Sequence, residues 1–226
     1  MSAAPKTVLR ATPEEEAAIR AAVRQAGRDN ARTLLSPAHE DALFSFFSDP
    51  SLSYWIYDLP RPLTIENTRA WIADRVMRHE RGECLCTVTF NEAGEIASYS
   101  DTALWPDRSS AEITGGGRAE RQNSGRGSAN TANAFDFIFE VLGVRLMCVT
   151  AALDNVRSQR AIDNAGFVRM GGRDAVRPDG TIRPSIYWEM TREQWRARKA
   201  AARAPFGFLP RGSSWSSLRK VVQASL

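Results

Sequence analysis

The stretch Gln122-Asn123-Ser124-Gly125-Arg126-Gly127-Ser128-Ala129 contains two glycines and runs directly into an apolar segment with helical spacing. Two glycines among small neighbours let the backbone turn so tightly that several N–H groups point to one side. The following helix adds unpaired N–H donors and the positive end of its dipole. Together these features favour a seat for a phosphate or pyrophosphate. The same pattern also fits an ordinary glycine turn before a helix, because short glycine motifs are common.

The segments on both sides of this stretch alternate between helical and strand patterns. Before it we expect helices over residues 12–28, 37–48 and 64–80, and strands over residues 31–36, 83–90 and 95–104 and from residue 111. After it we expect an apolar helix ending at Gly143, a strand over 145–152, a short helix ending at Gly166, strands over 167–171 and 183–190, and a helix from 191. The strand over 145–152 is almost continuously apolar, which predicts a central place in a sheet. The class is therefore α/β (α+β).

The composition excludes several classes of protein. With 43% hydrophobic and 25% charged residues, the chain has the balance of a globular domain. No apolar run reaches the roughly 20 residues that span a bilayer, and the first residues lack the apolar core of a signal peptide. Three cysteines and two histidines give neither a disulfide framework nor zinc-ligand spacing. We therefore expect a cytoplasmic protein without a metal and without a membrane partner.

The positive charge is concentrated at one end of the chain. Residues 196–226 carry seven Lys and Arg and no acid, so a net charge of +4 for the whole chain leaves −3 for residues 1–195. A nucleic-acid-binding face needs basic residues on the folded body, and this distribution argues against one. We expect a basic tail over 196–226, a main domain over 31–195 and a helical extension over 1–30. The thin apolar stripe of the first helix suggests loose packing or docking on a partner chain.

Four ordered motifs resemble those of the GNAT superfamily of acyl-CoA-dependent N-acetyltransferases. Gln122-x-x-Gly125-x-Gly127 is similar to the family's acyl-CoA signature, and Ala111-Glu112-Ile113 lies upstream at the spacing of its histone-acetyltransferase branch. Asn155-Val156-Arg157-Ser158 followed by Ala165-Gly166-Phe167 resembles a further family block. Features such as Phe47-Ser48-Asp49-Pro50 and Leu63-Thr64-Ile65-Glu66 resemble the Rim-type branch. The resemblance covers residues 31–195. It implies the GNAT fold, a mixed, mostly antiparallel twisted sheet flanked by helices.

The resemblance also implies a binding site for acetyl-CoA. The pyrophosphate would lie on residues 122–129, and the pantetheine arm would pair with the backbone of Gly116, Gly117 and Arg118. The side chains of Asn155 and Ser158 would reach the same arm. Simpler roles stay open for each group: Arg126 as a solvated surface residue, the glycines as a plain bulge, and Asn155 and Ser158 as helix-capping residues.

The candidate base is Glu112, which occupies the place of a catalytic strand glutamate in some branches. A glutamate that only orders a water, or a surface glutamate, is the alternative. The resemblance suggests a backbone N–H near Gly116 as the oxyanion donor. Many members have a tyrosine that protonates the thiolate where this chain has Ile162, so the sequence names no general acid.

An acceptor site is expected between an aromatic loop and the last hairpin. Its residues would be Tyr54, Trp55, Tyr57 and Tyr187, since exposed aromatic side chains suit a binding wall. Packing of these aromatics into the core is the alternative.

The expected activity is direct transfer of an acetyl group, in a ternary complex, to a primary amine of a protein N-terminus or a small molecule. The resemblance also suggests a homodimer. A catalytically silent acyl-CoA-binding module, acting as a sensor or partner protein, is the second hypothesis. Nucleic-acid association through the basic tail is the third.

Overall fold

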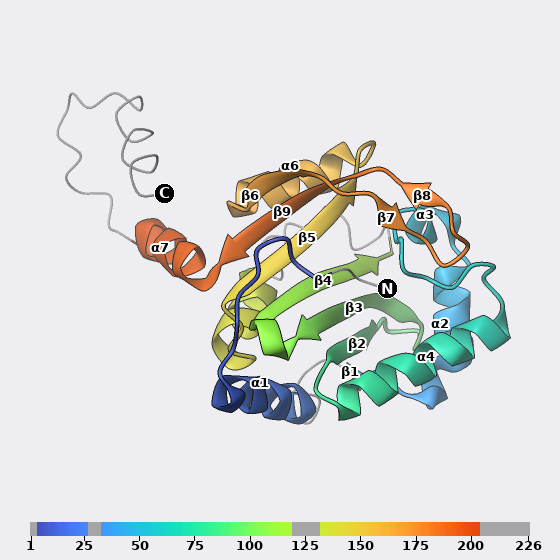
Figure 1. The fold of residues 1–226 in the computed structure, drawn as a ribbon. Helices are drawn as coiled ribbons and strands as arrows, with labels where there is room; N and C mark the ends of the chain where they lie inside the picture. The colour runs from blue at the N-terminus through green and yellow to red at the C-terminus, as the bar shows by residue number, and fades with distance from the viewer. Residues whose placement is uncertain (1–3, 27–32, 119–131, 204–226) are drawn as a thin grey trace.

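The computed structural model describes residues 4–26, 33–118 and 132–203 (Figure 1). Its centre is a seven-stranded sheet in the order β1 (Thr33–Leu34), β2 (Cys84–Phe90), β3 (Ile96–Trp105), β4 (Ser110–Gly117), β5 (Leu146–Ala152), β9 (Ser185–Thr191) and β6 (Val168–Gly172). Neighbouring strands are antiparallel except β4 and β5, which are parallel. The expected mixed, mostly antiparallel sheet is therefore confirmed, with β5 inside it.

The helices begin and end where local sequence signals place them. They are α1 (Pro13–Gln25), η1 (Pro37–His39), α2 (Glu40–Phe47), α3 (Pro50–Ser53), α4 (Ile65–Glu80), η2 (Pro106–Arg108), α6 (Val156–Ala165) and α7 (Arg192–Arg203), together with helical residues 132–136, which continue as the π-helix η4 (Phe137–Val141). Thr12 and Thr64 cap α1 and α4 by accepting backbone N–H bonds. Gly166 ends α6 in a left-handed conformation, with φ 91°.

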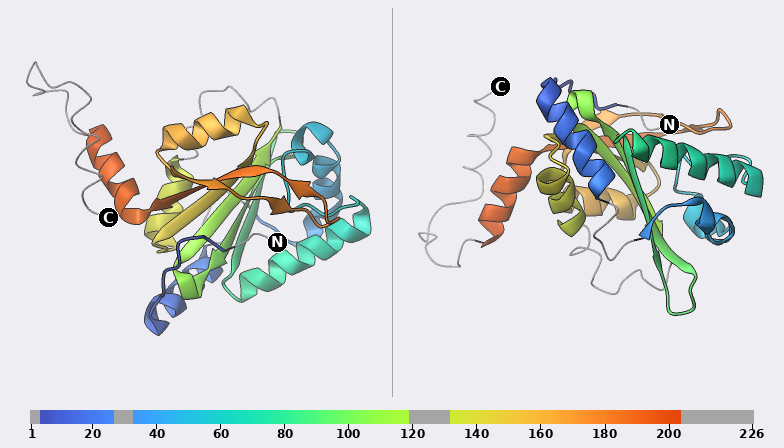
Figure 2. Two further views of the ribbon diagram at one scale, coloured as in Figure 1. Left: turned by 45° about the horizontal axis from the view of Figure 1, so that its top comes forward. Right: turned by 90° about the horizontal axis from the view of Figure 1, so that it is seen from below.

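Two hydrophobic clusters cover the two faces of the sheet. Alternation along β5 sends Met147, Val149 and Ala151 to one face, where they pack with α1 and the 132–141 helix. On the other face, Cys84, Cys86 and Tyr99 pack with α2 and α4. Figure 2 shows α2 and α4 on one side of the sheet and η4 and α6 on the other. The sheet is thus a shared wall between two layers of helices.

Both terminal segments pack more closely than their composition suggests. The stripe of α1 is buried against the sheet, with Ile19 2% and Val23 0% exposed, so the expectation of loose packing was wrong. At the other end α7 continues into the expected tail, where Arg196 pairs with Glu140. A thin stripe was enough because Ile19, Val23 and the capping residue Ala26 pack with buried apolar residues of the sheet, such as Leu85 and Leu104. Residues 204–226 of the tail lie outside the described ranges.

The last hairpin is divided into two parts. Residues 183–190 were expected to form one strand, but Pro184 separates β8 (Ile182–Arg183) from β9. Proline has no N–H for a ladder hydrogen bond, so the chain leaves the main sheet here. β8 instead pairs with β7 (Ala175–Val176) in a separate two-stranded sheet. In the described ranges, no helix has both the length and the apolar character to cross a membrane.

Candidate active site

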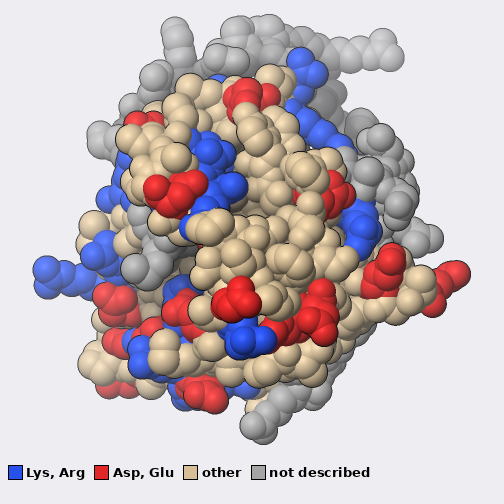
Figure 3. Space-filling model, turned by 90° about the vertical axis from the view of Figure 1, so that its right-hand side faces the viewer, with Lys and Arg blue, Asp and Glu red and all other residues tan. Residues whose placement is uncertain are grey.

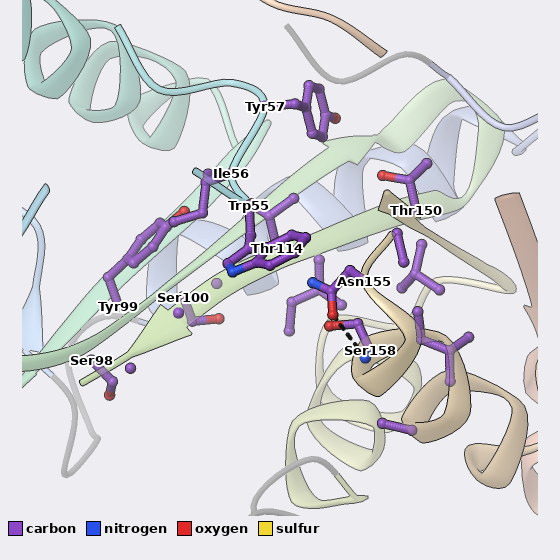
Figure 4. A pocket seen from close by; sticks show the side chains of 18 of the residues that line it. Trp55, Ile56, Tyr57, Ser98, Tyr99, Ser100, Thr114, Thr150, Asn155 and Ser158 are labelled. Carbon is purple, nitrogen blue, oxygen red and sulfur yellow. Dashed lines mark hydrogen bonds between the residues drawn. The ribbon is translucent and has the colours of Figure 1, made fainter. Parts of the chain in front are cut away.

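The two parallel strands at the centre of the sheet separate partway along their length. β4 and β5 pair only from Ser110–Leu146 to Glu112–Cys148, yet β4 continues to Gly117 and β5 to Ala152. A cleft of about 500 Å³ occupies the space between the diverging ends (Figure 4). Backbone groups on this side of β4 therefore face the cleft instead of a neighbouring strand.

The cleft is lined by small and hydroxyl-bearing side chains on one wall and by α6 on the other. The loop after α3 contributes aromatic side chains to the lining. The lining includes Trp55, Tyr57, Tyr99, Ser100, Thr114, Gly115, Gly116, Gly117, Thr150, Asn155, Ser158 and Ile162. Such a mixture gives room for an extended ligand with both polar and apolar parts.

The three glycines at the end of β4 have different surroundings. A Cβ on Gly115 would lie 2.8 Å from the carbonyl oxygen of Tyr99, so close packing of β3 excludes a side chain there. A Cβ on Gly116 would make only ordinary contacts, at 3.5 Å or more. Gly116 and Gly117 both line the cleft, as expected.

Arg118 does not join them. Its backbone N–H donates to the carbonyl oxygen of Ala97 at 3.0 Å, and its Nε donates to the carbonyl oxygen of Ile96 at 2.9 Å. The guanidinium group lies over the ring of Phe46. The backbone N–H of Arg118 therefore pairs with β3 and does not face the cleft, so a ligand contact of Arg118 stays a prediction.

Asn155 and Ser158 meet at the start of α6. The Oδ1 atom of Asn155 accepts the backbone N–H of Ser158 at 3.1 Å, which caps the helix. Both residues also line the cleft, and Figure 4 shows the amide nitrogen of Asn155 on the cleft side. The cap therefore uses the side-chain oxygen of Asn155, and the side-chain NH2 group is directed toward the cleft. Gln122, Asn123, Ser124, Gly125, Arg126, Gly127, Ser128 and Ala129 lie outside the described residues.

Glu112 is the acid at the point where β4 and β5 separate. Its side chain is buried, and Oε2 accepts the hydroxyl hydrogen of Tyr57 at 2.9 Å. Oε1 accepts a longer bond from the hydroxyl of Thr150 at 3.4 Å. Tyr57 and Thr150 both line the cleft, so each connects the buried carboxylate to the cleft by one hydroxyl group.

A buried arginine completes this network. Arg183 donates from Nη2 to the Thr150 hydroxyl at 3.3 Å, and its guanidinium lies over the Tyr57 ring, 4.9 Å from the centroid. Burial lowers the pKa of Arg183. Our sequence analysis singled out neither Arg183 nor Thr150. Cys148 on β5 pairs with Glu112 on β4, and Thr150 lies two positions further along β5. Because alternate residues of a strand share a face, this spacing could have placed Thr150 on the same face as Glu112.

The expected aromatic residues divide into three groups. Trp55 and Tyr57 line the cleft. Tyr54 is 54% exposed and lines a neighbouring hollow. Tyr187 is fully buried on β9, where its hydroxyl donates to Glu189 and accepts the backbone N–H of Lys6. For Tyr187 the structure therefore shows the alternative of core packing, because the N-terminal segment covers it.

The loop that carries Tyr57 is anchored by a buried ion cluster. Arg75 bonds to Asp58 and to Asp101 at 3.0 Å each, and the side chains of Arg75, Asp58 and Asp101 are only 6%, 1% and 4% exposed. Burial and the nearby Asp101 charge raise the pKa of Asp58. Asp58 directly follows Tyr57, so the cluster holds the tyrosine in place at the cleft.

Comparison with protein families gives a match over most of the cleft-forming chain. The family model described as "Acetyltransferase (GNAT) domain" matches residues 32–168. A comparison with curated proteins finds no match.

Solved structures with this architecture include three with informative descriptions. Mycobacterium smegmatis RimJ in complex with CoA-disulfide is 16% identical, with a TM-score of 0.60 over 76% of this chain and 88% of that chain. Ribosomal-protein-S5-alanine acetyltransferase from Vibrio fischeri is 13% identical, with a TM-score of 0.60 over 73% and 93%. A point mutant of spermidine N-acetyltransferase SpeG from Vibrio cholerae is 13% identical, with a TM-score of 0.59 over 75% and 99%. At these identities the likeness shows the fold, whereas the family model covers more than half of the chain. The chain therefore belongs to the GNAT family of N-acetyltransferases.

Proposed function

We propose that this protein transfers an acetyl group from acetyl-CoA to a primary amine, in a ternary complex, and that the amine belongs to a protein N-terminus or a small molecule. The observation that carries the proposal is the position of Glu112, buried where β4 and β5 separate and linked to the cleft by two hydroxyl groups. Solved neighbours described as acting on a ribosomal protein and on spermidine illustrate both acceptor classes.

The cleft has the features that a coenzyme A arm needs. The unpaired side of β4 at Gly116 and Gly117 offers backbone groups, as an open strand edge does for an added strand. Asn155 and Ser158 offer side-chain groups from the opposite wall. The residues 122–129 are proposed, from the sequence alone, to hold the pyrophosphate. When bound, the coenzyme supplies an acetyl group activated as a thioester.

The residues around Glu112 are suited to moving a proton. An ammonium group has no lone pair, so the acceptor must lose a proton before its nitrogen can attack the acetyl carbonyl. In this proposal the Tyr57 hydroxyl passes its hydrogen to Oε2 of Glu112 and takes the proton of the acceptor, directly or through one water. Burial holds both groups in fixed positions. As the C–N bond forms and the C–S bond breaks, the leaving thiolate must gain a proton.

One observation favours a silent acyl-CoA-binding module as the second candidate. Ile162 lines the cleft at the place where the family resemblance expects a tyrosine, and an isoleucine cannot give a proton to the thiolate. The hydroxyl group of Tyr57 is a second possible proton donor to the thiolate, because Tyr57 lines the same cleft. Its hydroxyl donates a hydrogen bond to Glu112.

The two candidates differ in whether thiol is released. The test is incubation with acetyl-CoA and a panel of amines, with free thiol followed continuously. Release that depends on the amine, and that is lost in Glu112→Gln, would support the transferase. Tight binding of CoA with no amine-dependent release across the panel would support the silent module and refute the transferase.

A further inference from the structure

Three arginines surround the aromatic loop that contributes Trp55 and Tyr57 to the cleft wall. Arg61 follows the loop, whereas Arg177 and Arg183 come from the β7–β8 hairpin. Their guanidinium groups donate to the backbone carbonyls of four consecutive residues: Arg61 to Ser53 and Ile56, Arg177 to Tyr54, and Arg183 to Trp55. Three positive charges are thus gathered around one short turn. Figure 3 faces this side of the molecule and shows a group of basic side chains in the upper half, with acidic side chains beside it, where Figure 1 places β7, β8 and α3.

These arginines lack the carboxylate partners that buried arginines usually have. Within the described part of the chain, none of the three forms an ion pair within 4.0 Å, whereas Arg75 has three carboxylate partners. The Nε atoms of Arg61 and Arg177 are buried without any hydrogen-bond partner. Burial lowers the pKa of Arg61, and the nearby Arg177 charge lowers it further. Arg183 is buried, whereas Arg61 and Arg177 are half-buried. A partly desolvated cation without a directly bonded carboxylate is unfavourable, so this arrangement is suited to an added anion.

The nearby carboxylates have other partners. Asp179 accepts hydrogen bonds from the backbone and hydroxyl of Thr181 within its own turn. Asp154 accepts the hydroxyl of Tyr54 at 3.2 Å. Glu112 is linked to Arg183 through the Thr150 hydroxyl, and its charge counteracts the lowering of the Arg183 pKa by burial. Each of these acids reduces the positive potential, and none bonds directly to an arginine of the cluster.

The arginines join the cleft to a second hollow. Arg177 and Arg183 line a hollow of about 290 Å³ together with Tyr54, Leu153 and Asp154. Arg183 is also part of the cleft wall. A molecule whose amine lies near Glu112 could therefore extend past Arg183 and place another group beside Arg177.

We propose that this hollow binds an anionic group of the acceptor, so that the acceptor is an amine that also carries a carboxylate or a phosphate. This inference rests on the proposed acetyltransferase function and names the class of its acceptor. It excludes a polyamine as the preferred acceptor, since a second ammonium group would meet Arg177 and Arg183.

Paired acceptors test the proposal by turnover. The pairs are 6-aminohexanoate with 6-aminohexanamide, and phosphoethanolamine with ethanolamine, with spermidine as the cationic acceptor. We expect kcat/KM to favour the anionic member of one pair at least tenfold, and the pair that shows the preference identifies carboxylate or phosphate. Arg177→Gln should reduce this preference about tenfold to a hundredfold, the effect of losing a hydrogen bond to a charged group. Arg177→Lys should retain part of it.

A binding measurement separates this inference from the proposed function. Thermal melts with glutarate or inorganic phosphate, in the presence of saturating CoA, should show a rise in Tm for the wild-type protein. The rise should persist in Arg24→Gln, an exposed arginine on α1 at the other end of the molecule (Figure 1), and disappear in Arg177→Gln. Among the described residues Arg177 forms no ion pair, and its hydrogen bond to the Tyr54 carbonyl is long, at 3.4 Å, so its replacement should lower Tm only slightly.

The outcomes are distinct. If no acceptor releases thiol, the proposed function fails, and the melts still test the anion site. Equal turnover of both members in each pair, or a preference for spermidine, would overturn the inference while the transferase assignment stands. Absence of any anion-dependent rise in Tm would overturn it independently of turnover.

Discussion

Replacement of Glu112 by glutamine tests the proposed base with little change in shape. Oε2 of Glu112 accepts from Tyr57 at 2.9 Å and Oε1 from Thr150 at 3.4 Å. Glutamine keeps one carbonyl oxygen for Tyr57 and places its amide group at the Thr150 hydroxyl, which can accept a hydrogen bond. Since both contacts have a replacement, we expect the free energy of unfolding to change by no more than about 1 kcal/mol.

The expected loss of activity is much larger than the loss of stability. The amide of Gln cannot take a proton, and positioned acid–base groups contribute roughly 10²–10⁴-fold to a rate. We therefore expect kcat/KM to fall by that factor, which corresponds to roughly 3–5 kcal/mol of transition-state stabilisation. The loss should shrink as pH rises, because more of the acceptor amine is then already deprotonated in solution.

A matched control exists two strands away in the sheet. Glu189 is also buried and also accepts a tyrosine hydroxyl, that of Tyr187, but Tyr187 does not line the cleft, whereas Tyr57, the partner of Glu112, does. Thiol release by Glu189→Gln should stay close to wild type at a temperature where both variants are folded. If Glu112→Gln keeps activity within about threefold of wild type, or if both variants lose activity equally, Glu112 is not the base and the reasoning from its position fails.

Three further predictions concern the cleft wall, the loop anchor and the titration of stability. Asn155→Asp should keep the helix cap but weaken CoA binding, measured by calorimetry, because it removes the side-chain NH2 group. Asn155→Ala should weaken CoA binding as well and also lower the free energy of unfolding by about 1 kcal/mol, because the cap is lost. Equal CoA affinity in both variants and wild type would limit Asn155 to capping. Arg75→Met should cost about 3–5 kcal/mol in urea denaturation, because Asp58 and Asp101 lose their shared partner; a loss below about 1 kcal/mol would contradict this. Burial lowers the pKa of His39 below its usual 6.5, so its contribution to stability is present above pH 6.5 and is lost as pH falls through the lowered value. Between these two pH values, the Tm of His39→Gln should fall less steeply with decreasing pH than the Tm of the wild type. An equal slope for both proteins would refute this prediction.

Much of the fold follows from local patterns in the sequence. Alternation and apolar continuity predicted β5 at the centre of the sheet, and Thr12, Thr64 and Gly166 marked helix ends through capping physics that operates within a few residues. The motif order then indicated where β4 and β5 would lie. The burial of α1 was missed because amphipathicity shows how wide an apolar stripe is but does not show which surface of the folded chain will cover it.

The candidate site was predictable only where one strand or helix determines the position of a residue. Glu112 and Asn155 fall in this class, and the structure places both beside the cleft or on it. The burial of Tyr187 could not be predicted, because alternation gives its face but gives no sign that residues 4–7 cover that face. Arg183 was missed because its role depends on three segments that meet only in the folded chain, the loop of Trp55, β5 and the β7–β8 hairpin.

Amide hydrogen exchange with and without CoA tests the central claim, that the space between the diverging β4 and β5 strands binds the coenzyme. The account predicts that CoA slows exchange over residues 113–117 of β4 and at the start of α6 near Asn155, with little change in α1. Binding of CoA without protection in these two segments, or no binding at all, would contradict it.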